Sequence, residues 1–182
     1  QFRNLNVVSC GGQTAIPLLY AMAGQNARID YIEVVTSIAS QSAGASCRCN
    51  IDEYIENTEE SIRFFTNCPN VKNILIFNPA VPCIDMQTTI VAKIKNPDMK
   101  RIAGAVEQMA NKIQSYVPGY QLAVPPVLED GRVFMMVRVK GRGDYLPDYA
   151  GNLDIINCAA IATAEECARI YFKHSKPERE YA

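Results

Sequence analysis

The spacing of apolar and polar residues predicts a chain that is part strand and part helix. β-Branched and aromatic residues, alternating with polar ones or running together, predict strands at 28–39, 71–77, 88–94, 121–127 and 132–140. The short apolar run Leu5–Val8 predicts the end of a further strand ahead of them. Helical spacing and helix-start residues predict helices at 14–23, 50–67, 98–115 and 153–173.

The third predicted helix shows the clearest amphipathic pattern. Ile102, Val106, Met109 and Ile113 recur three or four residues apart along it. Residues at this spacing share one face of a helix, which predicts a stripe that packs into the core rather than a cofactor site.

The order of the elements predicts an α+β fold. Glu129-Asp130-Gly131 lies between two predicted strands and is typical of a hairpin turn, and the helices do not alternate strictly with strands. We therefore expect an antiparallel or mixed sheet covered by helices. A length of 182 residues suits a single domain over 1–182.

The stretch 9–13, Ser-Cys-Gly-Gly-Gln, carries the most suggestive chemistry. It follows the first apolar run and precedes the first predicted helix. Proline is tolerated in the first turn of a helix, so Pro17 predicts a helix that begins near Thr14, a suitable N-cap. The unpaired N–H groups and the dipole at a helix start lower a thiol pKa, which favours a reactive thiolate at Cys10.

Two glycines after this cysteine extend the hypothesis. Gly11 and Gly12 leave open backbone whose N–H groups could point at a developing oxyanion. The same pattern also fits a buried, inert cysteine beside a tight turn, because free cysteines are commonly found in protein cores.

Composition limits the classes of binding partner that we expect for this protein. Apolar residues make up 48% of the chain and charged residues 20%, with a formal net charge of -1, all ordinary values for a globular protein. The sequence has no basic run, no RNA-binding signature and no apolar stretch of about 18 residues. We therefore expect neither nucleic acid nor a membrane as a partner.

The seven cysteines indicate a reducing compartment. An odd number of them, without a signal segment, argues against a disulfide framework. Cys47 and Cys49 are the one tight pair, and the single histidine is His174. Structural zinc usually needs two such pairs, so we expect no metal site.

Four segments stand in a fixed order along the chain. They are Val8-Ser9-Cys10-Gly11-Gly12-Gln13; Ser42-Ala43-Gly44 with Arg48 and Asn50-Ile51-Asp52-Glu53; Tyr116-Val117-Pro118-Gly119-Tyr120; and Tyr145-Leu146-Pro147 with the run from Tyr149 to Ile155. Together they closely resemble the catalytic and dimerisation half of the acylating acetaldehyde dehydrogenases. In that family this half follows a nucleotide-binding domain.

The resemblance implies an enzyme of aromatic compound catabolism that oxidises acetaldehyde to acetyl-CoA, with NAD as cofactor and coenzyme A as co-substrate. Cys10 would be the nucleophile whose thiolate attacks the aldehyde carbon. The thiohemiacetal would give hydride to the nicotinamide, and coenzyme A would intercept the acyl thioester left on Cys10. A thiolate suits both steps because sulfur attacks a carbonyl well and also leaves well.

The resemblance also assigns the nicotinamide side of the site. It implies cofactor contacts from Asn152 and from the run Ser42, Ala43, Gly44, Ala45, Ser46, Cys47, Arg48, Cys49 and Asn50. Asn50 would in addition be a catalytic residue that orients the reacting groups near Cys10. Amide side chains donate and accept hydrogen bonds without placing a charge against a hydride.

The chain departs from the family pattern at three places. The family usually has Ala-Gly-Pro-Gly-Thr-Arg-Ala at 43–49, whereas this chain has Ser46 for a glycine and gains two thiols. The acid that the family places beside the catalytic cysteine is Thr88 here. Asp85 lies three residues earlier on a strand and is expected to face the opposite way. The histidine before Tyr-Leu-Pro is Asp144.

The sequence contains no G-x-G-x-x-G motif after a strand. We therefore expect a fragment that lacks an N-terminal NAD-binding domain and does not turn over aldehyde by itself. Two other functions remain open. One is a catalytically silent dimerisation or interaction domain of the same fold, and the other is an NAD-independent Cys acyltransferase or thioesterase.

The resemblance further implies partners and a location. It implies a homodimer formed through the sheet or the last helix, and a 4-hydroxy-2-oxovalerate aldolase that passes acetaldehyde to the enzyme. It also implies a cytoplasmic protein.

Overall fold

The computed structural model describes residues 4–25 and 28–174. Its helices are α1 (Cys10–Ala23), α2 (Ala45–Cys49), α3 (Ile51–Thr66), α4 (Met99–Gln114) and α5 (Gly151–His174), with a 3₁₀ turn, η1, at Ser40–Ser42. Its strands are β1 (Ile29–Ala39), β2 (Val71–Asn78), β3 (Met86–Ile94), β4 (Tyr120–Glu129) and β5 (Arg132–Val139). The five strands predicted from residue 28 onward are thus confirmed.

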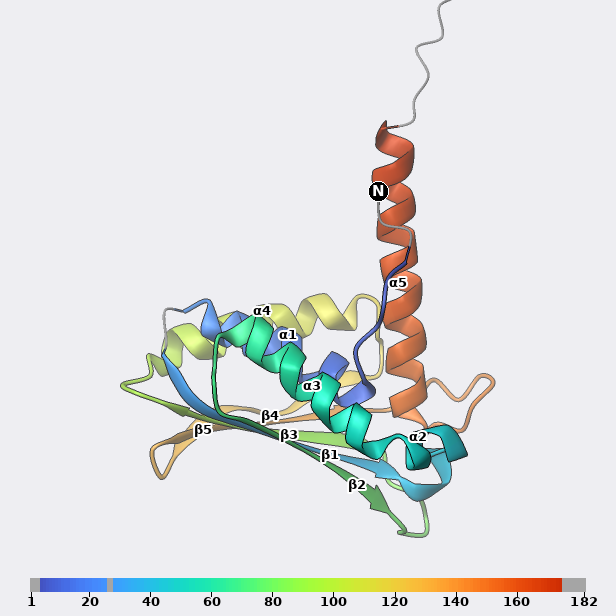
Figure 1. The fold of residues 1–182 in the computed structure, drawn as a ribbon, viewed down its shortest axis with the longest axis horizontal. Coiled ribbons are helices and arrows are strands. Elements are labelled where there is room, and N and C mark those ends of the chain that lie inside the picture. The colour runs from blue at the N-terminus through green and yellow to red at the C-terminus, as the bar shows by residue number, and fades with distance from the viewer. Residues whose placement is uncertain (1–3, 26–27, 175–182) are drawn as a thin grey trace, which may run out of the picture.

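The strands form a five-stranded mixed sheet in the order β2-β1-β3-β5-β4 (Figure 1). β1 and β2 are parallel, and the other neighbouring pairs are antiparallel. The predicted α+β class is confirmed. The predicted hairpin joins β4 to β5 through Asp130 and Gly131, which both have positive φ angles of 48° and 72°, as a tight hairpin turn requires.

Helices α1, α3 and α4 cover one face of the sheet (Figure 1). Alternate residues of the strands, such as Val34 and Ile90, face these helices and are fully buried. The predicted stripe of α4 packs into the same core, with Ile102 and Val106 completely buried and Met109 partly buried against it.

Helices α1 and α3 pack against each other and run in the same direction. Near their starts the Cys10 sulfur contacts the Tyr54 hydroxyl. Near their ends the rings of Tyr20 and Phe65 meet edge to face, with centroids 6.2 Å apart. Both helix N-termini therefore lie at the same end of the pair.

The start of α1 differs from the prediction. The helix begins at Cys10 rather than near Thr14, because the hydroxyl of Ser9 caps it by accepting the Gly12 N–H at 3.1 Å. Pro17 consequently lies inside the helix instead of in its first turn. The run Leu5–Val8 is not a strand, and Val8 packs against the core instead of joining the sheet.

The segment 40–46, between the strand predicted at 28–39 and the helix predicted at 50–67, is partly helical. It forms η1, and α2 begins at Ala45. Asn50 is the N-cap of α3, but its side chain makes no capping hydrogen bond, so the amide is left available for other contacts.

Helix α5 stands away from the sheet (Figure 1). Its first turns are anchored by buried residues such as Asn152, Ile155 and Ala159, whereas most residues from Ala160 to Tyr171 are exposed. Within the described ranges, no helix combines the length and the apolar character that crossing a membrane demands.

Candidate active site

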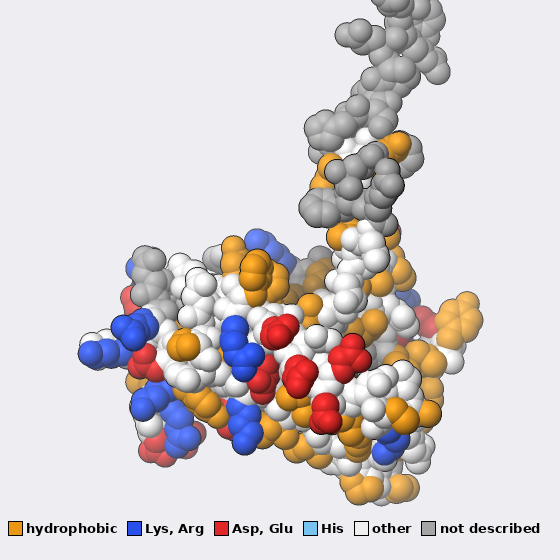
Figure 2. All heavy atoms as spheres, viewed as in Figure 1, with side chains coloured by type: hydrophobic (Ala, Val, Ile, Leu, Met, Phe, Trp, Pro, Cys, Tyr) orange, Lys and Arg blue, Asp and Glu red, His pale blue; other side chains and the backbone are white. Residues whose placement is uncertain are grey.

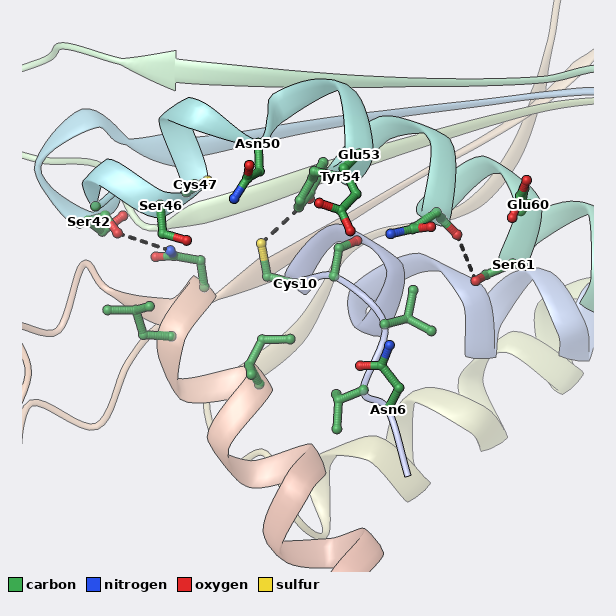
Figure 3. Close-up of a pocket in the computed structure, with 18 residues that line it drawn as sticks. Asn6, Cys10, Ser42, Ser46, Cys47, Asn50, Glu53, Tyr54, Glu60 and Ser61 are labelled. Atoms are coloured by element: carbon green, nitrogen blue, oxygen red, sulfur yellow. Dashed lines mark hydrogen bonds between the residues drawn. The ribbon is translucent and has the colours of Figure 1, made fainter. Parts of the chain in front are cut away.

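A cavity of about 800 Å³ opens at the common N-terminal end of α1 and α3. Its walls come from the segment before α1, from η1 to α3, and from the first turns of α5 (Figure 3). Its polar lining includes Ser9, Cys10, Ser42, Asn50, Tyr54 and Asn152. The fold therefore gathers side chains from four separate stretches of sequence around one thiol.

Cys10 is the first residue of α1 and points into this cavity (Figure 3). Its sulfur lies 3.5 Å from the hydroxyl of Tyr54. Burial raises the pKa of the Cys10 thiol above its ordinary value of 9.0, and the hydrogen bonds from Tyr54 and from the Gly11 amide oppose this rise. The expectation of a lowered pKa is therefore wrong, because loss of hydration outweighs the helix start.

The expectation that Gly11 and Gly12 point N–H groups at an oxyanion is also wrong. The Gly11 N–H donates to the Tyr54 hydroxyl at 3.0 Å. The Gly12 N–H donates to the Ser9 hydroxyl at 3.1 Å. Both amides are already paired, so a developing charge needs another donor.

Gly11 is required by close packing. A Cβ at this position would lie 2.6 Å from the Thr36 hydroxyl and 2.6 Å from the Tyr54 hydroxyl. Glycine therefore lets the first turn of α1 rest directly on β1 and on Tyr54.

The residues predicted to contact the cofactor fall into two groups. Six of them line the cavity: Ser42, Gly44, Ser46, Cys47, Asn50 and Asn152. The other four, Ala43, Ala45, Arg48 and Cys49, are not among its lining residues. The structure thus brings Cys10 together with both predicted amide side chains, and Asn50 extends toward Cys10 (Figure 3).

Arg48 fastens the loop that carries Ser42. Its guanidinium donates to the Ser40 carbonyl at 2.8 Å and to the Ala43 carbonyl at 3.1 Å. It also lies over the ring of Phe77, 4.7 Å from the centroid. These contacts give Arg48 a role in holding the cavity wall in shape.

Asn152 has one satisfied and one unsatisfied end. Its Nδ2 donates to the Ser42 carbonyl at 3.3 Å. Its Oδ1 is buried and makes no hydrogen bond. Buried polar atoms are nearly always paired, so this oxygen is an unsatisfied acceptor, and its burial keeps it out of direct reach from the cavity unless the side chain turns.

Thr88 takes the place of the acid that the family resemblance led us to expect. It is completely buried, and its hydroxyl lies 3.2 Å from that of Thr36. Because Thr36 contacts the backbone at Gly11, this pair supports the site from behind the first turn of α1.

Sequence reasoning missed the contribution of α3 beyond Asn50. Glu53, Tyr54, Asn57 and Glu60 all line the cavity, and Glu53 and Tyr54 extend from the side of α3 that faces Cys10 (Figure 3). Acidic side chains gather on the face seen in Figure 2. The helical spacing from Asn50 to Tyr54 was the available signal, since residues four apart share a face.

The described residues contain no group of three or more His, Cys, Asp or Glu side chains that could hold a metal ion. The sheet and the cavity together define a class of protein domain. It is an α+β domain in which a cysteine at a helix start faces a cavity lined by amide side chains.

Comparison with known proteins identifies the family. A family model described as "Prokaryotic acetaldehyde dehydrogenase, dimerisation" matches residues 10–147. The chain belongs to this family, as the four sequence segments predicted.

The relatives agree with this assignment. The acetaldehyde dehydrogenase of Spirochaeta aurantia is 54% identical over 166 residues, which cover 91% of this chain and 56% of that protein. That of Pectobacterium atrosepticum is 56% identical over 163 residues, covering 90% and 55%. The chain therefore spans about half the length of the curated relatives it matches. Among solved structures, aspartate semialdehyde dehydrogenase II from Vibrio cholerae aligns with a TM-score of 0.47 and 13% identity, over 86% of this chain and 57% of that one.

Proposed function

We propose that the chain is the catalytic and dimerisation part of an acylating acetaldehyde dehydrogenase that makes acetyl-CoA through a thioester on Cys10. The observation that supports this proposal best is the convergence of Cys10, Asn50 and Asn152 on one cavity. They come from three separate segments, and the family resemblance assigns all three to the same reaction.

The cavity suits the nicotinamide end of NAD. Asn152 borders a wall lined by Ser42, Gly44 and Ser46. Its unpaired Oδ1 is buried, so it can accept an N–H from a carboxamide once the side chain turns toward the cavity. NAD, when bound, supplies the acceptor for the hydride that leaves the aldehyde carbon. The acidic side chains of α3 repel phosphates, so we expect the phosphates of NAD and coenzyme A to lie away from that wall.

Cys10 forms and breaks the bonds to the substrate carbon. Its sulfur attacks the aldehyde carbon, forming a C–S bond while the carbonyl oxygen takes the electron pair. After oxidation the acyl group is held as a thioester. The thiol of coenzyme A then loses its proton to solvent and attacks the same carbon, and the C–S bond to Cys10 breaks to release its thiolate. The amide of Asn50 is placed to orient the reacting carbonyl by donating a hydrogen bond.

The proposal includes a homodimer formed through the uncovered face of the sheet. On this face Val35 neighbours Ile74, and Val91 neighbours Phe134, across adjacent strands. These four side chains are only half-buried, and no helix in the described part of the chain covers this side (Figure 1). A row of apolar side chains on an open sheet face is typical of an interface.

Light scattering tests the dimer. The wild-type chain should be dimeric, and a Val91→Glu/Phe134→Glu variant should be monomeric. Val81→Glu is the matched control, because Val81 is 85% exposed in a loop outside the sheet. A wild-type monomer at high concentration would contradict the interface.

The resemblance extends the proposal to a cytoplasmic setting and to an aldolase partner that delivers acetaldehyde.

The experiment that tests the activity joins the nucleotide-binding domain of a family member ahead of residue 1. The fusion should reduce NAD with acetaldehyde and coenzyme A, whereas the isolated chain should not. Cys10→Ala should abolish the activity, and Cys49→Ala, at an exposed position outside the cavity, should retain it. A folded fusion that binds NAD without reducing it would indicate the silent domain. Acyl transfer without NAD would indicate the acyltransferase.

A further inference from the structure

The hydroxyl of Tyr54 sits between the backbone and the sulfur of the proposed nucleophile. It lies 3.0 Å from the Gly11 nitrogen and 3.5 Å from the Cys10 sulfur. An amide N–H can only donate, so the Tyr54 oxygen accepts from Gly11. The single proton of the phenol is therefore available to a different partner.

The neighbouring hydroxyls already have partners for their own protons. Thr58 donates its proton to the Tyr54 carbonyl at 2.6 Å. Since a hydroxyl carries one proton, the Thr58 oxygen can only accept from Ser9, which lies 2.5 Å away. The Ser9 oxygen in turn accepts the Gly12 N–H. Ser9 thus has no proton left to give to the cysteine.

The charge on the sulfur decides the direction of the hydrogen bond between Tyr54 and Cys10. Gly11 donates to the Tyr54 hydroxyl, Ser9 also interacts with it, and between Tyr54 and a neutral Cys10 either group can be the donor. A thiolate carries no proton and can only accept, so the phenol donates to the sulfur once Cys10 is ionised. This hydrogen bond favours the ionised form of Cys10.

The ionisation of both groups is consistent with this direction. Burial raises the pKa of Tyr54 far above its ordinary value of 10.0, and the neighbouring Cys10 raises it further. The phenol thus keeps its proton while Cys10 ionises. Burial also raises the pKa of Cys10, and the hydrogen bond from Tyr54 is the largest effect that lowers it.

We propose that Tyr54 stabilises the Cys10 thiolate by donating its hydroxyl proton to the sulfur, in place of an acid at position 88. The inference rests on the proposed function, in which Cys10 is the nucleophile. The same hydrogen bond acts twice in that reaction. It stabilises the sulfur before it attacks the aldehyde, and it stabilises the sulfur again when coenzyme A displaces it.

The test is the alkylation of Cys10 by iodoacetamide across a pH series, followed by mass spectrometry of the peptide that contains Cys10. This readout needs neither NAD nor turnover. Tyr54→Phe removes the donor and keeps the ring. At neutral pH its rate should fall about tenfold, because a hydrogen bond to a charged group shifts the thiolate population by about that factor. The two rates should converge at alkaline pH.

Two further variants provide a control and a second way to change the acidity of Tyr54. Tyr31→Phe is the matched control, since it removes a hydroxyl that donates to Glu33 on a strand remote from the cavity lining, and its rate should be unchanged. Replacing Tyr54 by 3-fluorotyrosine, a more acidic phenol of nearly the same size, should raise the neutral-pH rate. This variant answers the question even if Tyr54→Phe fails to fold.

The possible results separate the two proposals. Equal rates for wild type, Tyr54→Phe and the fluorinated protein would overturn the role of Tyr54 and leave the dehydrogenase proposal standing. A folded wild-type protein whose Cys10 resists alkylation at every pH would overturn both. A slower Tyr54→Phe with a faster fluorinated protein would support the inference.

Discussion

Cys10 and Cys68 lie near opposite ends of the α1–α3 pair, and burial raises the pKa of both thiols. Cys68 is only 1% exposed, and its S–H donates to the Asn70 carbonyl at 3.4 Å. Cys10 instead lines a cavity, and its sulfur lies beside the Tyr54 hydroxyl. One sulfur is enclosed by protein, and the other borders a cavity beside a side-chain hydroxyl.

The surroundings of Cys10 and Cys68 show how a reactive cysteine differs from a structural one. Burial does not distinguish them, because it disfavours the thiolate at both ends. A hydrogen bond with the Asn70 backbone lowers the pKa of Cys68, as the hydrogen bond with Tyr54 lowers that of Cys10, so hydrogen bonding alone does not distinguish them either. Access from the cavity and a side-chain hydroxyl beside the sulfur set Cys10 apart. The following variants test whether this contrast is real.

Removing each thiol in turn should give the largest difference in activity between the two sites. In the fusion with a nucleotide-binding domain, Cys10→Ala should lower kcat/KM by at least about a thousandfold, because the nucleophile is gone. Cys68→Ala should leave kcat/KM close to wild type. Steady-state NAD reduction measures both, and an equally inactive but folded Cys68→Ala would contradict the contrast.

Placing a methyl group behind Cys10 should be the next largest effect. Gly11→Ala sets a Cβ against Thr36 and Tyr54, which should lower the free energy of unfolding by about 1–3 kcal/mol. It should also slow alkylation of Cys10 by displacing the Tyr54 hydroxyl. Gly104→Ala in α4 is the control, since nothing lies within 4 Å of its Cβ. It should stabilise by about 0.5–1 kcal/mol in urea unfolding.

Raising the pH above 9.0 should lower the free energy of unfolding through groups at both ends of the α1–α3 pair. Cys10, Cys68 and Tyr54 all have folded pKa values above their ordinary values of 9.0, 9.0 and 10.0. Above pH 9.0 the unfolded chain loses these protons first and so binds fewer protons than the folded state. Stability should therefore fall as pH rises, by up to about 1.4 kcal/mol per pH unit for each group. Urea unfolding of Cys10→Ala/Cys68→Ala should show a shallower fall starting at pH 9.0, and an identical slope would count against the shifts.

The smallest expected effect is on stability at neutral pH. Cys68→Ala removes a buried sulfur and its hydrogen bond, so the free energy of unfolding should drop by about 1 kcal/mol. Cys10→Ser keeps an acceptor for the Tyr54 hydroxyl and should change it by less than about 0.5 kcal/mol, since Cys10 is only partly buried against the core. A larger loss at Cys10 than at Cys68 in urea titrations would reverse the structural assignment of the two thiols.

Local pattern predicted most of the fold because much of it is locally encoded. The α4 stripe, the Asp130-Gly131 turn and the alternation in β3 each depend on residues close in sequence. The start of α1 was misplaced because the Ser9 cap was overlooked, and Pro17 is accommodated inside the helix. Leu5–Val8 carries a strand-like composition but packs elsewhere, which only tertiary structure decides.

The site was predicted less completely than the fold. Cys10, Asn50 and Asn152 were expected to meet, and they line one cavity. Tyr54 was missed, because its contact with Cys10 spans 44 residues of sequence and depends on α1 and α3 running in the same direction. The Gly11 amide was wrongly assigned for the same reason, since its acceptor is the Tyr54 hydroxyl. The Gly12 amide was wrongly assigned because its acceptor is the overlooked Ser9 cap, three residues earlier.

The unpaired, buried oxygen of Asn152 would also discriminate between ligands of the same shape, if the side chain turns toward the cavity in the proposed NAD site. A molecule that presents a carbonyl or ether at this point leaves two lone pairs facing each other with no proton between them. A molecule of equal size with an N–H there closes the pair. An unpaired buried acceptor costs about 1–3 kcal/mol, so roughly ten- to hundredfold selectivity can arise here from a single missing proton.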